Sequence, residues 1–176
     1  MKARLTPAGL VIGGRRMPVQ IGRSGLRRDK REGDGATPVG ALRIVGLLWR
    51  ADRLPRPAPW ARAIGPRDLW CDASGHPEYN HPVRAPFPAS HERMRRADPL
   101  YDIVLLTDWN FPDAKPGRGS AIFVHQRRRL GFPTAGCIAL RRADLIRVAR
   151  MLRPGDVIEV PMLASHRGAR RRDVTV

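Results

Sequence analysis

The stretch IFVHQRRRLGFPTAGCIAL, residues 122–140, places a histidine and a cysteine on the two sides of one basic turn. His125 follows a run of apolar residues, and Cys137 comes twelve positions later, directly after a glycine. Short apolar runs bounded by turn residues are typical of buried strands. The pattern therefore predicts a strand over Ser120–Val124 that ends at His125, and a loop that can bring imidazole and thiol together.

A cysteine and a histidine in this arrangement suit nucleophilic catalysis. A free thiol with a pKa of about 8.5 is only partly ionised at neutral pH, and an adjacent imidazole can take its proton. Gly136 permits a tight turn that aims the N–H groups of Gly136 and Cys137 at a developing oxyanion, and Thr134 offers a hydroxyl to the same turn. The residues alone leave a second interpretation open, in which His125 is a packed core residue and Cys137 a small buried hydrophobe.

The flanking sequence predicts a β-rich domain with one or two helices. Leu145, Val148, Ala149 and Leu152 follow the i, i+3, i+4, i+7 spacing of an amphipathic helix that Pro154-Gly155 ends. A short helix over Ser90–Arg96, with Ser90 as its N-cap, is also expected. Further strands are predicted over Arg4–Gly22 (two strands about a Gly13-Gly14 turn), Ala41–Trp49, Tyr101–Leu106 and Val157–Val160.

The length of 176 residues fits one domain. We expect that domain over residues 1–164 and a basic, mobile tail over 165–176. No run approaches the ~20 apolar residues of a membrane span. Met1–Gln20 shows no apolar segment of the kind found in a signal peptide.

The formal net charge of +17 favours polyanionic partners such as nucleic acid, anionic lipid or a carboxylate-rich polymer. An arginine bias spread along the whole chain explains the charge equally well, since only three of the 33 basic residues are lysines. No aromatic residues interleave with the short arginine runs, so a base-stacking nucleic-acid partner is not expected.

The two cysteines, Cys71 and Cys137, leave both a disulfide and separate packing open. The five histidines show no CxxC or HxxxH spacing, so no metal site is expected. Thiolate chemistry also needs no cofactor, and none is expected.

The segment from His125 to Thr134-Ala135-Gly136-Cys137-Ile138 resembles the signature of the YkuD-type L,D-transpeptidase catalytic domain, a histidine followed by Ser/Thr-x-Gly-Cys and an apolar residue. Other stretches are similar to that family in the same order: Met17–Gly22, the loop Thr37-Pro38-Val39-Gly40, Tyr79-Asn80 and Gly119–Phe123. The resemblance covers roughly residues 10 to 160.

The resemblance implies a β-sandwich-like catalytic domain that cross-links bacterial peptidoglycan through a thioester on stem peptides, and so serves cell-wall biogenesis and cell shape. By that resemblance Cys137 is the nucleophile, His125 the base, Thr134 the Ser/Thr position, and Gly136 with Cys137 the oxyanion turn. Four residues are expected to contact substrate: Tyr79, Asn80, Ser120 and Arg141.

Two departures from the family pattern bear on the bond that is made. Ala135 stands where many members have a second histidine, and the spacing from His125 to Thr134 is short. The cross-link, 3→3 or 1→3, stays open, as do a cysteine hydrolase that uses water as acceptor and a basic module that binds the sacculus or nucleic acid without catalysis. The family implies the periplasm or cell envelope as location, although no signal peptide is visible, and we expect a monomer.

Overall fold

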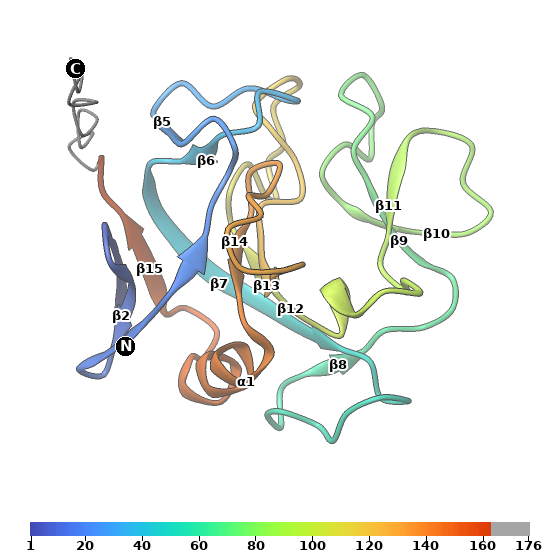
Figure 1. The fold of residues 1–176 in the computed structure, drawn as a ribbon. Helices are drawn as coiled ribbons and strands as arrows, with labels where there is room; N and C mark the ends of the chain where they lie inside the picture. The colour runs from blue at the N-terminus through green and yellow to red at the C-terminus, as the bar shows by residue number, and fades with distance from the viewer. Residues whose placement is uncertain (163–176) are drawn as a thin grey trace, which may run out of the picture.

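The computed structural model describes residues 1–162 and is mainly β with a single α-helix, as the sequence predicts (Figure 1). The expected tail, 165–176, lies outside the described residues. The strands are β1 (Lys2–Thr6), β2 (Gly9–Ile12), β3 (Arg15–Met17), β4 (Val19–Gln20), β5 (Leu26–Arg27), β6 (Thr37–Pro38), β7 (Gly40–Trp49), β8 (Arg62–Ala63), β9 (Asp68–Cys71), β10 (Pro82–Arg84), β11 (His91–Arg93), β12 (Ile103–Thr107), β13 (Phe123–Gln126), β14 (Ile138–Leu140) and β15 (Val157–Val160). The helices are the 3-10 turn η1 (Pro99–Tyr101) and α1 (Arg142–Met151).

Ten strands form one curled sheet in the order β3-β2-β1-β15-β7-β12-β13-β14-β4, with β8 paired to β7. The long strand β7 pairs with β15 along its first residues and with β12 along its last, so it belongs to both halves of the sheet (Figure 1). The outermost strands β3 and β4 are separated in the chain only by Pro18, which has no N–H to offer a neighbour. The chain thus passes directly from one end of the strand order to the other, giving a barrel-like sandwich.

The N-terminal strands follow the prediction. β2 and β3 pair about Gly13-Gly14, and both glycines have positive φ, at 53° and 73°. Two positive-φ residues give the turn whose twist matches that of a hairpin, and glycine adopts it without steric cost. The hairpin predicted about Gly13-Gly14 is therefore confirmed. The two strands expected over Arg4–Gly22 are four in the structure, because the chain also turns after Thr6 and crosses at Pro18 to the other end of the strand order.

Alternation along the central strands divides the interior into two cores. Ile103 and Leu105 of β12 face the first core, while Val104 faces the second. On β13, Val124 faces the first core and Phe123 the second. Because side chains alternate across a strand, His125 points to the same side as Phe123.

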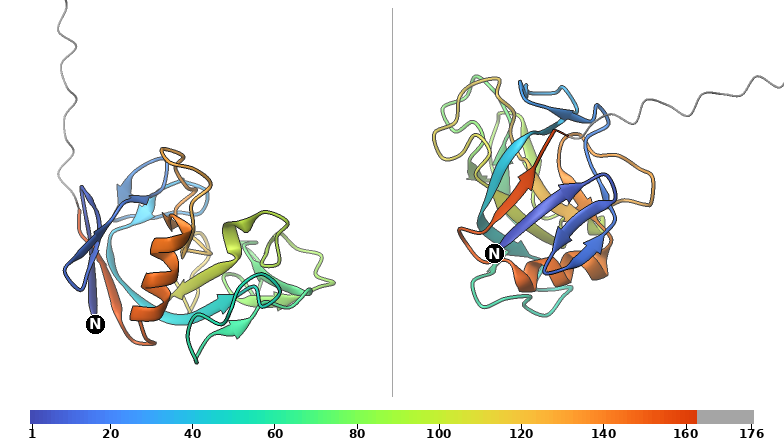
Figure 2. Two further views of the ribbon diagram at one scale, coloured as in Figure 1. Left: turned by 60° about the horizontal axis from the view of Figure 1, so that its bottom comes forward. Right: turned by 90° about the vertical axis from the view of Figure 1, so that its left-hand side faces the viewer.

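Helix α1 covers the first core. Its predicted apolar face, Leu145, Val148, Ala149 and Leu152, is buried there, and Figure 2 shows the helix lying against the curved sheet. Leu152 forms the C-cap and Pro154-Gly155 follows, so the helix ends where the sequence predicts. Among residues 1–162, none of the helices is long and apolar enough to cross a membrane.

The short helix expected over Ser90–Arg96 is wrong. Residues His91–Arg93 form β11, which pairs with β9 in a separate three-stranded sheet of the order β10-β9-β11. β9 is buried along its whole length and offers backbone groups on both sides. Pairing with it satisfies the backbone of a segment that is too short to be stable as an isolated helix, and Met94 is thereby buried in the second core.

Two strand boundaries also differ from the sequence expectation. Tyr101 lies in η1, so β12 begins two residues later than predicted, at Ile103. The residues before β13 are not a strand, because Ala121 has a positive φ of 50° and the chain turns there. Both differences occur where the chain borders the cavity described next.

Candidate active site

The register of β13 and β14 brings His125 and Cys137 to one face of the sheet. The two strands are parallel, and His125 is paired with Ala139. Residues paired in register point to the same side, and Cys137, two positions before Ala139, points there as well. The pairing of the two strands therefore places the imidazole of His125 and the thiol of Cys137 on the same face of the sheet, at neighbouring positions.

Both residues line a pocket with a volume of about 490 Å³. Its walls come mainly from the loop before β6, the segment from β11 to η1, residues 120–122 before β13, and the turn before β14. Arg23 and Asp72 contribute from two further segments. Of the site residues predicted from sequence, the pocket is lined by Ser120, His125, Thr134, Gly136 and Cys137.

Cys137 is half-buried, and its thiol has two backbone partners. The Sγ–H donates to the Ala121 carbonyl at 3.1 Å, and the Phe123 N–H points at Sγ from 3.4 Å. Burial raises the pKa of the Cys137 thiol to about 12, although the Phe123 N–H acts in the opposite direction. The resting thiol is therefore protonated at neutral pH and needs a base.

His125 is a neutral imidazole in a fixed orientation. Its Nδ1 lies 2.8 Å from the Gln126 carbonyl, which can only accept, so Nδ1 carries the hydrogen and Nε2 is left with a free lone pair. Burial lowers the pKa of His125 to about 4. The Tyr101 ring packs edge-on against the imidazole with centroids 5.3 Å apart. Within residues 1–162, no hydrogen bond joins the imidazole to the thiol, and the proton transfer requires the two to approach.

The turn that carries Cys137 is closed by Thr134. The Thr134 hydroxyl accepts from the Gly136 N–H at 3.1 Å and donates to the Cys137 carbonyl at 2.7 Å. Gly136 has a φ of 153°, and a Cβ at this position would lie 2.9 Å from the Ala36 carbonyl oxygen. Only glycine fits here. Since the Gly136 N–H is already bonded within the turn, it is not free as an oxyanion donor, whereas no described residue accepts from the Cys137 N–H.

Thr37, in the Thr37–Gly40 loop, holds this turn from behind. Its hydroxyl donates to the Gly136 carbonyl at 2.7 Å and accepts from the Gly22 N–H at 2.9 Å, and the side chain is fully buried. The sequence singled out this loop through its resemblance to the family pattern but gave Thr37 no role. Its contact across 99 positions of sequence is invisible without the fold.

Tyr79 and Asn80 lie behind the pocket and do not line it. Asn80 is buried, and its Oδ1 accepts from the Ala121 N–H and the Trp70 indole, both at 2.9 Å. Its Nδ2 donates to the Trp109 and Asn110 carbonyls. All of its bonding groups are therefore engaged within the protein, and its Oδ1 fixes the positive-φ turn at Ala121, whose carbonyl accepts from the thiol.

The Tyr79 hydroxyl donates to Glu32, and the Ser120 hydroxyl reaches the same Oε2 at 2.7 Å. Ser120 is thus in the pocket wall, while Tyr79 supports the wall from the protein side. Arg141 lies at the start of α1, away from the pocket lining, and its guanidinium pairs with Asp144 at 2.6 Å. Of the four residues expected to contact substrate, the structure brings only Ser120 to the pocket.

Charged residues that sequence reasoning missed also line the pocket. They are Arg23, Lys30, Glu32, Asp72, Glu92, Arg96 and Arg128. Burial raises the pKa of Glu92, although the hydrogen bond from the Tyr101 hydroxyl at 3.2 Å acts against the rise. Nothing in spacing or periodicity connects these positions, because they come from separate loops.

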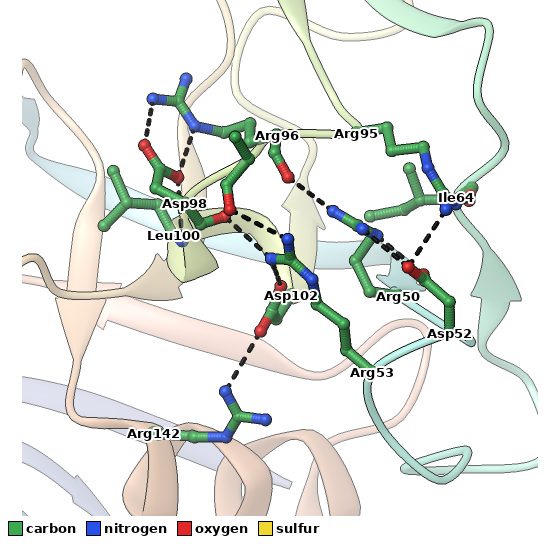
Figure 3. A network of polar contacts seen from close by, with 11 residues as sticks. Arg50, Asp52, Arg53, Ile64, Arg95, Arg96, Asp98, Leu100, Asp102 and Arg142 are labelled. Atoms are coloured by element: carbon green, nitrogen blue, oxygen red, sulfur yellow. Dashed lines mark hydrogen bonds and ion pairs between the residues drawn. The ribbon is translucent and has the colours of Figure 1, made fainter.

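An ion-pair network fixes the wall that contains Arg96 (Figure 3). The Arg96 guanidinium pairs with both oxygens of Asp98, at 2.9 and 2.8 Å, and lies over the Tyr101 ring. Below it, the buried Asp102 accepts from Arg53 at 2.8 Å and from Arg142 at 3.1 Å. The network ties η1 to the start of α1 and to the loop after β7.

The second thiol, Cys71, is not linked to Cys137. It lies on β9 with no exposed surface, and both cysteines are free thiols. Cys71 therefore packs, which settles the alternative that the sequence left open. Among the described residues, no group of three His, Cys, Asp or Glu side chains is arranged to hold a metal ion.

Comparison with known proteins identifies the family. The family model described as L,D-transpeptidase catalytic domain, YkuD, matches residues 8–160, which is most of the chain. No curated protein and no solved structure matches. The match spans every part of the pocket wall as well as the Thr37–Gly40 loop. The chain belongs to the YkuD family of L,D-transpeptidase catalytic domains.

Proposed function

We propose that this protein is a cysteine-dependent L,D-transpeptidase that joins peptidoglycan stem peptides through a thioester on Cys137. Enzymes of this family act on peptidoglycan. The observation that carries the proposal is the shared pocket of Cys137 and His125, with a protonated thiol and an imidazole whose Nε2 is free to accept a proton.

In the first half-reaction the Cys137 sulfur attacks the carbonyl carbon of a stem-peptide amide. The thiol proton passes to Nε2 of His125, the S–C bond forms, and the carbonyl electron pair moves to oxygen. Collapse of this tetrahedral species breaks the C–N bond, and the His125 proton goes to the departing amine. A D-amino acid leaves when a donor tetrapeptide is used.

In the second half-reaction an amine of a neighbouring stem attacks the thioester carbonyl. His125 takes the amine proton and returns it to the Cys137 sulfur as the S–C bond breaks. Water in place of the amine gives a shortened stem, so a carboxypeptidase shares every step up to the thioester.

The experiment is an incubation of the purified protein with muropeptides that carry tetrapeptide stems, followed by chromatography and mass spectrometry. We expect cross-linked dimers and exchange of the terminal D-amino acid. Their fragmentation would assign a 3→3 or a 1→3 bond. Shortened stems without dimers would reassign the protein to hydrolysis. The absence of any product, with folded protein whose Cys137 still reacts with a thiol reagent, would contradict the proposal.

The matched control is Cys137→Ala. A salt-dependent interaction with sacculi or DNA that persists in this variant, without any turnover by the unaltered protein, would favour the binding-only alternative. Because peptidoglycan lies outside the cytoplasmic membrane, we also propose the cell envelope as the place of action. Fractionation of cells that express the protein would test this directly.

A further inference from the structure

Lys30 is a buried cation in the wall of the catalytic pocket. Its side chain is 3% exposed, and its ammonium donates to Asp34 Oδ1 and to the Arg31 carbonyl, each at 2.6 Å. An ammonium group has three N–H donors. Among residues 1–162 the third donor has no acceptor, and Lys30 lines the pocket. Leaving a buried charged donor unused is costly unless a ligand completes it.

The Lys30 side chain lies next to two glycines, Gly119 and Gly136, and Gly136 directly precedes Cys137. A Cβ on Gly136 would come within 3.6 Å of the Lys30 Cε, and a Cβ on Gly119 within 3.3 Å of Nζ. Both glycines have positive φ. The lysine is therefore next to the turn that presents Cys137, and its charge acts to lower the pKa of that thiol against the larger effect of burial.

The turn itself supplies one donor fewer than acyl transfer uses. An oxyanion that forms on a carbonyl is usually stabilised by two positioned donors. The Gly136 N–H is bonded to the Thr134 hydroxyl, and so only the Cys137 N–H is available from the turn. Lys30, which has an N–H without an acceptor, lines the same pocket as Cys137, and its Cε would lie 3.6 Å from a Cβ on Gly136.

We propose that Lys30 is a catalytic residue whose third N–H, together with the Cys137 N–H, binds the oxyanion formed when Cys137 attacks a substrate carbonyl. Lys30 keeps its proton throughout: the carbonyl electron pair moves to oxygen, the ammonium compensates the charge, and His125 carries the proton to the leaving amine. This inference rests on the proposed function for the identity of the substrate, but the same step occurs with any acyl donor.

A purely structural role for Lys30 makes a different prediction. Asp34 accepts from Lys30 and also from the N–H groups of Arg31 and Ala36, so the pair could act only to hold this loop. Asp34→Asn loosens the loop while leaving the lysine charge in place. It is the matched control for Lys30→Met, which removes the charge and keeps a long apolar stem.

The decisive measurement compares two reactions of Cys137 in the same variants. Acylation by p-nitrophenyl acetate forms an oxyanion and releases p-nitrophenolate, whereas alkylation by iodoacetamide displaces iodide and forms none. For Lys30→Met we expect acylation to fall about 10²- to 10³-fold, the usual cost of one oxyanion donor, and alkylation to fall by no more than about tenfold. Lys30→Arg should recover part of the acylation rate, and Asp34→Asn should lose less than about tenfold.

Equal losses in both reactions, or equal losses in Lys30→Met and Asp34→Asn, would overturn the inference. Stem-peptide turnover is measured separately. If the unaltered protein is acylated by the ester in a Lys30-dependent way yet processes no muropeptide, the proposed function fails and the role of Lys30 stands.

A measurement on the unaltered protein covers the case in which Lys30→Met does not fold. The chain has only three lysines, Lys2, Lys30 and Lys115, so lysine labelled with carbon-13 at Cε gives three signals. Lys2→Arg and Lys115→Arg, both at exposed positions, assign them. Acetylation of Cys137 should shift the Lys30 signal and leave that of Lys2 unchanged. A Lys30 signal that does not move would contradict the proposal.

Discussion

The two walls of the pocket are held in place by different forces. The wall that presents Cys137, called here the reactive wall, consists of the Thr134–Cys137 turn and Thr37 behind it. It is fixed by neutral hydrogen bonds from the Thr37 and Thr134 hydroxyls to the backbone carbonyls of Gly136 and Cys137, and no Cβ fits at Gly136. The wall around η1, called here the ionic wall, is fixed by the Arg96–Asp98 ion pair and by ion pairs of Asp102 with Arg53 and Arg142 (Figure 3). Neutral bonds to backbone set atomic positions closely and ignore salt, whereas partly exposed ion pairs contribute less and are screened. The reactive wall thus tolerates less change than the ionic wall.

The largest expected effect comes from the reactive wall. Cys137→Ala removes the nucleophile and should lower stem-peptide turnover by at least about 10³-fold. Cys71→Ala, which alters the buried thiol on β9, should leave turnover measurable because Cys71 has no exposed surface. Rates for both variants, with circular dichroism to verify folding, check the contrast. Substantial turnover by Cys137→Ala would contradict it.

The next prediction concerns the protonation state at the reactive wall. Burial raises the pKa of Cys137 to about 12 and lowers that of His125 to about 4, so thiol and imidazole are both neutral between these values. The thiolate fraction therefore rises with pH until pH approaches 12. Between pH 7 and 10 the rate of Cys137 alkylation by iodoacetamide should rise about 10³-fold, tenfold per unit. A rate that is flat over this range would indicate a preformed thiolate–imidazolium pair.

Thr37→Val should have a smaller but clear effect. The variant keeps the shape of the side chain and loses the hydroxyl that links Gly136 to Gly22. Displacement of the turn should lower turnover by about 10- to 100-fold, and two buried groups left unsatisfied should cost about 1–3 kcal/mol of stability. Thr37→Ser, which retains the hydroxyl, is the control. Equal losses in both variants would show that the methyl group, rather than the hydrogen bond, matters.

The ionic wall should respond mainly in stability. Asp102→Asn keeps the size of a buried side chain and removes the charge shared by Arg53 and Arg142. Because both arginines are partly exposed, we expect a loss of about 1–3 kcal/mol in chemical denaturation, less than for a fully buried pair, and a loss that shrinks at high salt. Turnover should change by less than for Thr37→Val. A loss of turnover larger than that of Thr37→Val would contradict this expectation and would indicate that this wall contacts the reacting groups.

The same contrast explains how far the sequence could be read. Local signals sufficed where neighbouring residues decide the structure, as in the Gly13-Gly14 hairpin and the apolar face of α1. The residues alone left open whether His125 and Cys137 form a site, and the resemblance to the family favoured that interpretation. The roles of Thr37 and Lys30 depend on contacts between segments far apart in the chain. Tyr79, Asn80 and Arg141 show the reverse case, since polar residues near a motif support the fold or pair at the surface as readily as they meet a ligand.

The expected helix over Ser90–Arg96 failed for a related reason. A segment of seven residues is too short for its helix propensity to decide its structure, and pairing with the free side of β9 overrode that propensity. The ionic wall could not be predicted at all, because a chain with a net charge of +17 offers each carboxylate many possible arginine partners.

The central claim, that Cys137 is the acyl-accepting nucleophile, is tested most directly by intact-mass spectrometry after rapid acid quenching of the protein with a tetrapeptide-stem donor. We expect an adduct whose mass equals the donor minus its departing amine, located by digestion on the peptide that contains Cys137 and released by hydroxylamine as a thioester is. An adduct on Cys71 or on another side chain would contradict the account. So would product that forms while no thioester adduct is detected at any quench time.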